Sequence, residues 1–148
     1  MVADDANNYL YWTRKNGIDR KQLDGTGETE EVYTNLAFAS FSGLTFDAEG
    51  GRILFCDGSG RGRAFYQDVS TTSGEIGPAV ELTPGQSGIS LTFNPKDVAI
   101  LNGKVYWLDV PAKLGIMTHY DNVETLSYTE YNITAFESVR RLCIAYVN

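Results

Sequence analysis

The sequence predicts an all-β fold, and three observations support this prediction. The chain has 148 residues, which is enough for one domain with a buried core. It contains 15 Gly, 9 Tyr and 7 Phe, a composition typical of short strands joined by tight turns. An aromatic, strand-like segment also occurs three times along the chain. Together these features favour a repeated β-structure over a helical one.

The repeated segment is interpreted as the second strand, B, of each repeat. Its copies are residues 8–14, 52–57 and 104–109. Aligning Tyr11 with Phe55 and Tyr106 gives spacings of 44 and 51 residues, the period of four-stranded β-propeller blades with variable loops. A second apolar series predicts the first strand, A, of each repeat at residues 37–46, 92–100 and 135–144.

Two further strand-like stretches, C and D, follow each B strand. The hairpin signal Asp24-Gly25 separates C from D in the first repeat, and a Gly/Ser/Thr-rich loop separates them in the second. Turns from A to B are predicted at Glu49-Gly50-Gly51 and Asn102-Gly103. The C strands are predicted at residues 17–23, 63–69 and 114–120, and the D strands at 30–34, 79–83 and 125–129.

This strand order predicts a single half-propeller domain over residues 1–148. Because the chain begins at a B strand and ends at an A strand, the first blade is expected to be split between the two ends of the chain. The predicted blades cover residues 9–34 with 139–147 (blade 1), about 41–83 (blade 2) and about 95–130 (blade 3).

The B strands resemble a known repeat. Tyr11-Trp12-Thr13-Arg14 and Tyr106-Trp107-Leu108-Asp109, with residues 23–27 after the first, are similar to the YWTD repeats of low-density-lipoprotein-receptor-type propellers. The resemblance implies a six-bladed ring in which the motif residues are structural, with the aromatic ring between blades and the Asp bonded to a neighbouring blade. The sequence departs from the motif at Arg14, which replaces the Asp, and at Phe55-Cys56.

Three blades are too few to close a ring, since propellers have four to eight. We therefore expect a homodimer in which two chains close a six-bladed ring and each C-terminal A strand completes the first blade of the partner. Such an exchange would also remove an exposed sheet edge. The alternative is that these are three blades of a longer polypeptide.

Charge and hydropathy restrict the partners. The 12 Lys and Arg against 19 Asp and Glu give a net charge of −7, which argues against nucleic acid as a partner. The longest apolar run, residues 142–147, is far shorter than the roughly 20 residues of a spanning helix, so no membrane insertion is expected. The N-terminal residues lack the pattern of a signal peptide. The expected location is cytoplasmic, or extracellular if a signal has been removed.

No catalytic constellation is found, and the chain is expected not to be an enzyme. His119 is the single histidine and has no nucleophile beside it. The run 58–63 is similar to a phosphate-binding loop but lacks the helix that the motif needs. No cofactor and no metal site are predicted. Cys56 and Cys143 are interpreted as buried side chains, in preference to a disulfide or a reactive thiol.

Ligand binding is predicted on the face that carries the B-to-C and D-to-A loops. The candidate residues are Arg14, Asp57, Arg61, Arg63 and Asp109. For the two Asp, a purely structural role between blades is the alternative. Planar charged groups with interspersed aromatics favour a multivalent carbohydrate-binding protein. The alternatives are a protein-binding scaffold or fragment of a larger receptor, and a metal-dependent propeller hydrolase or lactonase.

Overall fold

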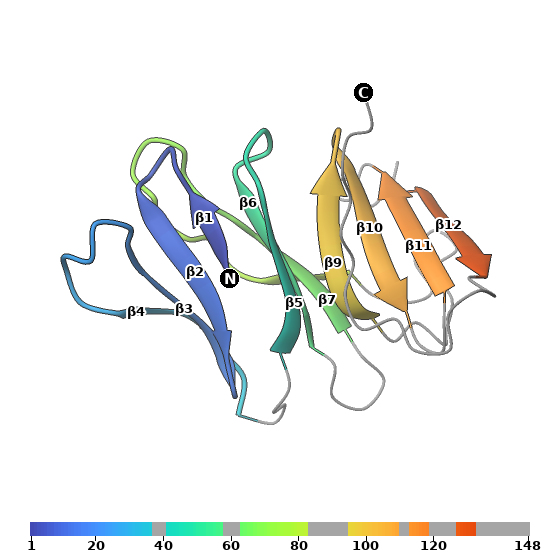
Figure 1. Cartoon of the computed structure of the whole chain (residues 1–148), viewed down its shortest axis with the longest axis horizontal. Coiled ribbons are helices and arrows are strands. Elements are labelled where there is room, and N and C mark those ends of the chain that lie inside the picture. The colour runs from blue at the N-terminus through green and yellow to red at the C-terminus, as the bar shows by residue number, and fades with distance from the viewer. Residues whose placement is uncertain (37–40, 58–62, 83–94, 110–112, 119–126, 133–148) are drawn as a thin grey trace.

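The described chain folds into three antiparallel sheets. A computed structural model describes residues 1–36, 41–57, 63–82, 95–109, 113–118 and 127–132, and these contain twelve strands and no helix. The three sheets each have four strands in chain order (Figure 1). The all-β prediction with three four-stranded blades is confirmed for these residues. The strands are β1 (Val2–Asp4), β2 (Tyr9–Arg14), β3 (Gly17–Gln22), β4 (Glu30–Thr34), β5 (Phe41–Asp47), β6 (Arg52–Asp57), β7 (Arg63–Asp68), β8 (Val80–Leu82), β9 (Pro95–Leu101), β10 (Lys104–Asp109), β11 (Lys113–Thr118) and β12 (Ser127–Asn132).

The first sheet obtains its A strand from the N-terminal residues. Val2–Asp4 pairs with β2, with Ala3 opposite Leu10. The Asp4 carboxylate is fully buried and accepts a hydrogen bond from the backbone N–H of Asn7 at 3.1 Å, which closes the turn into β2. This strand occupies the place that the sequence analysis assigned to residues 139–147. Those residues lie outside the described part of the chain, so their position stays a prediction.

The turns between A and B strands have one design in the first two sheets, where four residues separate the strands, whereas the third sheet has the two-residue turn Asn102-Gly103. In the second sheet, Asp47 accepts a hydrogen bond from the N–H of Gly50 at 3.0 Å, as Asp4 does from Asn7. The residue just before each B strand has a positive φ: 61° at Asn8, 61° at Gly51 and 66° at Gly103. Asn and Gly tolerate this conformation better than other residues. The predicted turns at 49–51 and 102–103 are confirmed.

The B strands align differently from the predicted register. The strands β2, β6 and β10 have six residues each, and their position-by-position match places Leu54, not Phe55, with Tyr11 and Tyr106. Phe55 then corresponds to Trp12 and Trp107. The correction by one residue matters because neighbouring side chains in a strand point to opposite faces.

The corrected register gives each sheet two distinct faces. In the second and third sheets, we call the face toward the preceding sheet the front face and the opposite one the back face. In the first sheet, the front face is the one that carries Trp12, at the strand position of Phe55 and Trp107. The back face of the first sheet packs Tyr11 and Ile18 against Phe55 and Phe65 of the second. The back face of the second sheet packs Leu54 and Cys56 against the third sheet, where the contacting residues are Val98, Val105, Trp107 and Met117.

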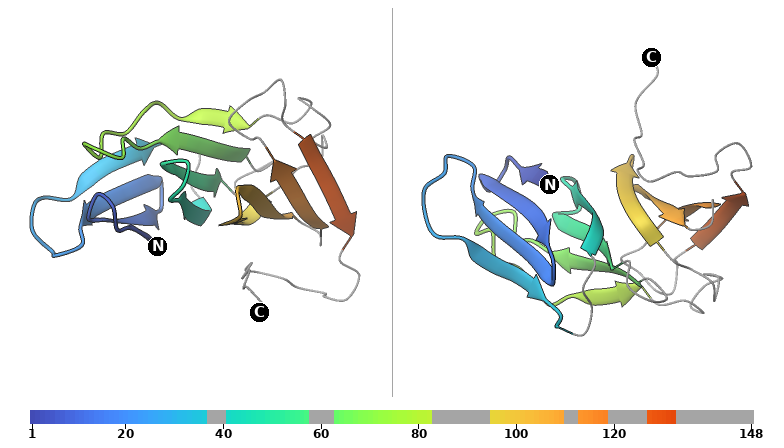
Figure 2. Two further views of the ribbon diagram at one scale, coloured as in Figure 1. Left: turned by 90° about the horizontal axis from the view of Figure 1, so that it is seen from above. Right: turned by 60° about the horizontal axis from the view of Figure 1, so that its bottom comes forward.

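The three sheets therefore stack front to back, side by side, as consecutive propeller blades do (Figure 2). The A strand β5 lies against β9 of the next sheet. Gly43 permits this approach, because a Cβ there would lie 2.6 Å from Cys56 Sγ and 2.7 Å from the Cα of Asp97. The described strands form an open set of three blades and no closed ring.

In the described chain, no helix has the length and apolarity needed to cross a membrane.

Cys56 provides a test of the junction between the second and third sheets. Its side chain is fully buried and accepts a hydrogen bond from the N–H of Gly43 at 3.2 Å. Burial raises the pKa of this thiol from 9.0 to about 12. Because the thiolate is the reactive form, Cys56 should resist iodoacetamide at pH 8 in the folded protein and react in guanidinium chloride, as measured by peptide mass spectrometry. Rapid labelling of the folded protein would contradict this junction.

The same shift predicts a direction for stability at alkaline pH. The thiol of the unfolded chain ionises near pH 9, whereas that of the folded chain stays protonated until about pH 12. The contribution of Cys56 to stability is therefore fully present below pH 9 and is lost as the pH rises toward 12.

Candidate functional site

Arg14, the first predicted ligand-binding residue, is held by the protein itself. It ends β2, and its Nε donates to Asp19 Oδ1 at 2.7 Å. The same guanidinium also donates to Glu31 and to the hydroxyl of Thr34. The hydrogen bond to Asp19 raises the pKa of Arg14. Arg14 thus joins β2 to β3 and β4 on the front face of the first sheet. Its guanidinium N–H groups are used in hydrogen bonds within that sheet.

Arg63 is also engaged within its own sheet. It begins β7, and its Nη1 lies 3.5 Å from Glu81 Oε2 of β8. Its guanidinium carbon lies 5.3 Å from the centre of the Phe65 ring. The side chain is mostly buried, with 26% exposure. Arg63 therefore joins β7 to β8 along the sheet surface.

The two predicted Asp residues take equivalent places in their sheets. Asp57 ends β6 opposite Arg63, and Asp109 ends β10 opposite Lys113. Arg14 ends β2 in the same way, so the three residues occupy one position of the repeat. The side chains of Asp57 and Asp109, and the whole of Arg61, lie outside the described residues, so their binding role stays a prediction.

A depression at the opposite edge of the sheets was not predicted from the sequence. We call this edge, with its A-to-B turns and C-to-D loops, the turn edge; its described segments are residues 5–8, 23–29, 48–51, 69–79 and 102–103. The A-to-B turns lie along the top of Figure 1. The depression has a volume of about 530 Å³, is widely open, and is lined by residues 50–52, 68–71 and 75–77.

Backbone hydrogen bonds shape this depression. The loop from 69 to 79 folds on itself through Ser70 N–H to the Glu75 carbonyl and Gly77 N–H to the Asp68 carbonyl, both at 2.8 Å. Val69 N–H donates to the Gly51 carbonyl at 2.7 Å and ties the loop to the neighbouring turn. The Gly/Ser/Thr-rich composition of this loop was the available signal in the sequence.

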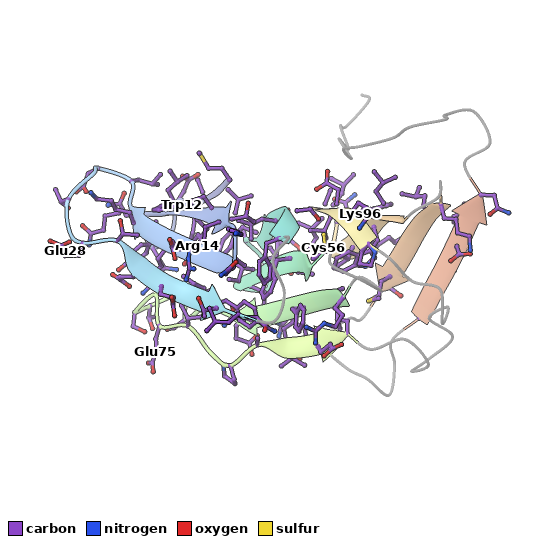
Figure 3. The ribbon with its side chains drawn as sticks, turned by 90° about the horizontal axis from the view of Figure 1, so that it is seen from below. Trp12, Arg14, Glu28, Cys56, Glu75 and Lys96 are labelled. Atoms are coloured by element: carbon purple, nitrogen blue, oxygen red, sulfur yellow. The ribbon has the colours of Figure 1, made fainter. Side chains whose placement is uncertain are left out.

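Carboxylates dominate the described surface of the turn edge. Lys104, at the start of β10 beside the turn 102–103, is exposed, and Arg52 is paired with Asp68 at 2.6 Å. Glu28 and Glu75 lie at the end of the molecule away from the third sheet (Figure 3). The edge is therefore negatively charged. Its exposed acidic residues are Asp5, Asp24, Glu28, Glu49 and Glu75, and Asp68 at the adjoining end of β7 is exposed as well.

Arg20 is a structural residue that the sequence analysis missed. It is 8% exposed and donates to Glu30 at 2.6 Å, to the Tyr11 hydroxyl at 3.4 Å, and to the Gly74 carbonyl. Burial by itself lowers the pKa of Arg20, but the hydrogen bonds with Tyr11 and Glu30 outweigh it and raise the pKa. Since Gly74 belongs to the second sheet, Arg20 fixes the loop at the depression to the first sheet.

Within the described ranges, no three His, Cys, Asp or Glu side chains are grouped so as to hold a metal ion.

Comparison with known proteins identifies the type of fold. No protein-family model matches the sequence, and no curated protein matches it. A solved structure described as "Crystal structure of Nidogen/Laminin Complex", which contains a YWTD-type β-propeller, matches with a TM-score of 0.61 and 12% identity. The match covers 86% of this chain and 46% of that chain. This chain thus spans about half the length of the one it matches, and the likeness is one of fold.

Proposed function

We propose that this chain is a non-enzymatic propeller scaffold that binds a protein partner through its turn edge. The open depression beside β6 and β7 is the observation that carries this proposal. Small-molecule sites enclose most of the ligand surface, whereas this surface is shallow and bordered by exposed backbone turns. It suits a segment of polypeptide that lies across it.

The charge of the turn edge suggests the chemistry of that segment. Asp68 is exposed beside the depression, and Glu49 and Glu75 are exposed in the turn and the loop that border it. The chain as a whole carries a net charge of −7. Complementary charge speeds association and selects among partners. We therefore propose a partner segment rich in Lys and Arg.

The comparison with solved structures supports a protein ligand in preference to a carbohydrate. The matched structure is, by its title, a complex between proteins. The carbohydrate hypothesis used the donors of Arg14 and Arg63, which bind Asp19 and Glu81 in this chain. Carbohydrate binding stays an untested alternative, as does the metal-dependent hydrolase.

A displayed library of random peptides, together with a glycan array, tests this proposal. We expect the chain to enrich basic peptides whose affinity falls with rising salt. The double variant Glu49→Gln/Glu75→Gln should weaken binding about fivefold, because two charges facing the ligand contribute on the order of 1 kcal/mol together.

A charge-matched control separates a local effect from net charge. The variant Leu36→Lys/Asn132→Lys raises the net charge by the same two units, at exposed positions outside the turn edge. It should leave peptide affinity within about twofold, as expected of a distant surface change. Glycan binding without peptide enrichment would overturn the proposed function.

A further inference from the structure

The front face of the first sheet and the back face of the third sheet are not packed against another described sheet. They are the two kinds of face that pack together at each junction inside the chain. On the front faces, Phe55 and Trp107 are fully buried against the preceding sheets. Trp12 has the same position in β2, and no described strand covers the front face of the first sheet; Trp12 is only partly buried. This strand position is therefore buried between sheets in the second and third sheets and remains partly exposed in the first.

The back face of the third sheet shows the complementary difference. Tyr11 and Leu54 are fully buried at the two junctions, whereas Tyr106, at the same position of β10, is partly exposed. Leu82 is 4% exposed, but Tyr131, which occupies its register position opposite β11, is 53% exposed. This face is apolar over several strands. Its partly or largely exposed residues are Ala99, Tyr106, Leu114, Ile116 and Tyr131, whereas Leu108 on the same face is 1% exposed.

We propose that a second copy of this chain covers both faces. The front face of the first sheet of each copy packs on the back face of the third sheet of the other copy. At both junctions inside the chain, the back face of one sheet packs on the front face of the next. A second copy would provide a back face for the first sheet and a front face for the third. Two copies supply six blades, a number within the range of four to eight that closes a propeller.

Burial of the front face leaves no isolated acidic group there. Asp19 lies opposite Trp12 on this face with Glu31 beside it in β4, and both carboxylates are already paired with Arg14. Unpaired buried charges oppose association strongly, and paired ones much less so. A closed dimer contains two equal junctions. Once the first has formed, the second forms within the same complex and gains from a high effective concentration.

The molar mass in solution is the first test. Light scattering should give about twice 16.3 kDa for the unmodified chain at micromolar concentration. Trp12→Glu alters the front face and Tyr131→Glu alters the back face, and each should give a single-chain mass. Leu36→Glu, at an 81% exposed position outside both faces, should stay dimeric. A monomeric unmodified chain, or a series of longer oligomers, would overturn the proposal.

Mixing the two variants tests the direction of the contact. In a mixed dimer, both changed faces meet at one junction, and the other junction is unchanged. Mixing Trp12→Glu with Tyr131→Glu should therefore restore part of the dimer, whereas neither variant dimerises alone. Disruption by only one of the two variants would indicate contact between identical faces and would overturn the proposal. Protection of Cys56 from iodoacetamide confirms that each variant is folded.

Discussion

Replacing Phe55 by Ala should lower the free energy of unfolding by about 3–5 kcal/mol, the usual cost of removing a buried aromatic ring. Phe55 is fully buried between the first two sheets. Its ring is stacked on Phe65 at a centroid distance of 5.2 Å and lies 5.0 Å from Tyr33 and 6.0 Å from Phe41. The variant loses all of these contacts and leaves a cavity at the junction. Denaturation with urea, followed by circular dichroism, measures the change.

Two variants serve as controls for this prediction. Phe55→Leu keeps most of the apolar volume and should cost less than Phe55→Ala. Leu36→Ala removes a side chain that is 81% exposed and should change stability by no more than about 0.5 kcal/mol. If Phe55→Ala were as stable as Leu36→Ala, the first two sheets could not pack as described.

The sequence was sufficient to identify the strands but not to place every one of them. The three aromatic segments correspond to β2, β6 and β10, because an apolar run ending in a polar loop is readable without structure. β1 was missed because Val2–Asp4 is short and is followed by another Asp, which is typical of a loop. The available signal was the repetition of Asp4 by Asp47, each placed five residues before a B strand.

The register error has a physical cause. Tyr11, Phe55 and Tyr106 were aligned because all three are aromatic, but Phe55 occupies the front-face position of Trp12 and Trp107. Large apolar residues occur on both faces of an inner blade, so ring size does not distinguish front from back. The polar residue that ends each strand, Arg14, Asp57 or Asp109, gives the correct alignment.

The candidate site was harder to predict than the fold. The sequence shows that Arg14 and Arg63 adjoin loops, but not that Asp19 and Glu81 are placed across the strands to bind them. Such pairs depend on strand register, which is set by the fold as a whole. The depression at the turn edge depends on backbone hydrogen bonds, which leave little trace in residue type.

Arg20 gives the second large prediction, because its hydrogen bond to the Gly74 carbonyl connects the first two sheets. Arg20→Ala should lower the free energy of unfolding by about 2–4 kcal/mol, since the Tyr11 hydroxyl and the Gly74 carbonyl would each lose a buried hydrogen-bond donor. The aliphatic part of the side chain and the contact of its guanidinium with the Tyr9 ring, at 4.0 Å, are lost as well. Urea denaturation again provides the measurement.

Arg52 offers a matched control, because its pair with Asp68 has the same 2.6 Å separation as that of Arg20 with Glu30. Asp68 is 64% exposed, and exposed ion pairs contribute at most about 1 kcal/mol. Arg52→Ala should therefore cost much less than Arg20→Ala. Arg20→Lys should fall between them, because an ammonium group keeps the charge but cannot reach Glu30, Tyr11 and Gly74 together. Equal losses for Arg20→Ala and Arg52→Ala would mean that the guanidinium of Arg20 does not join the two sheets.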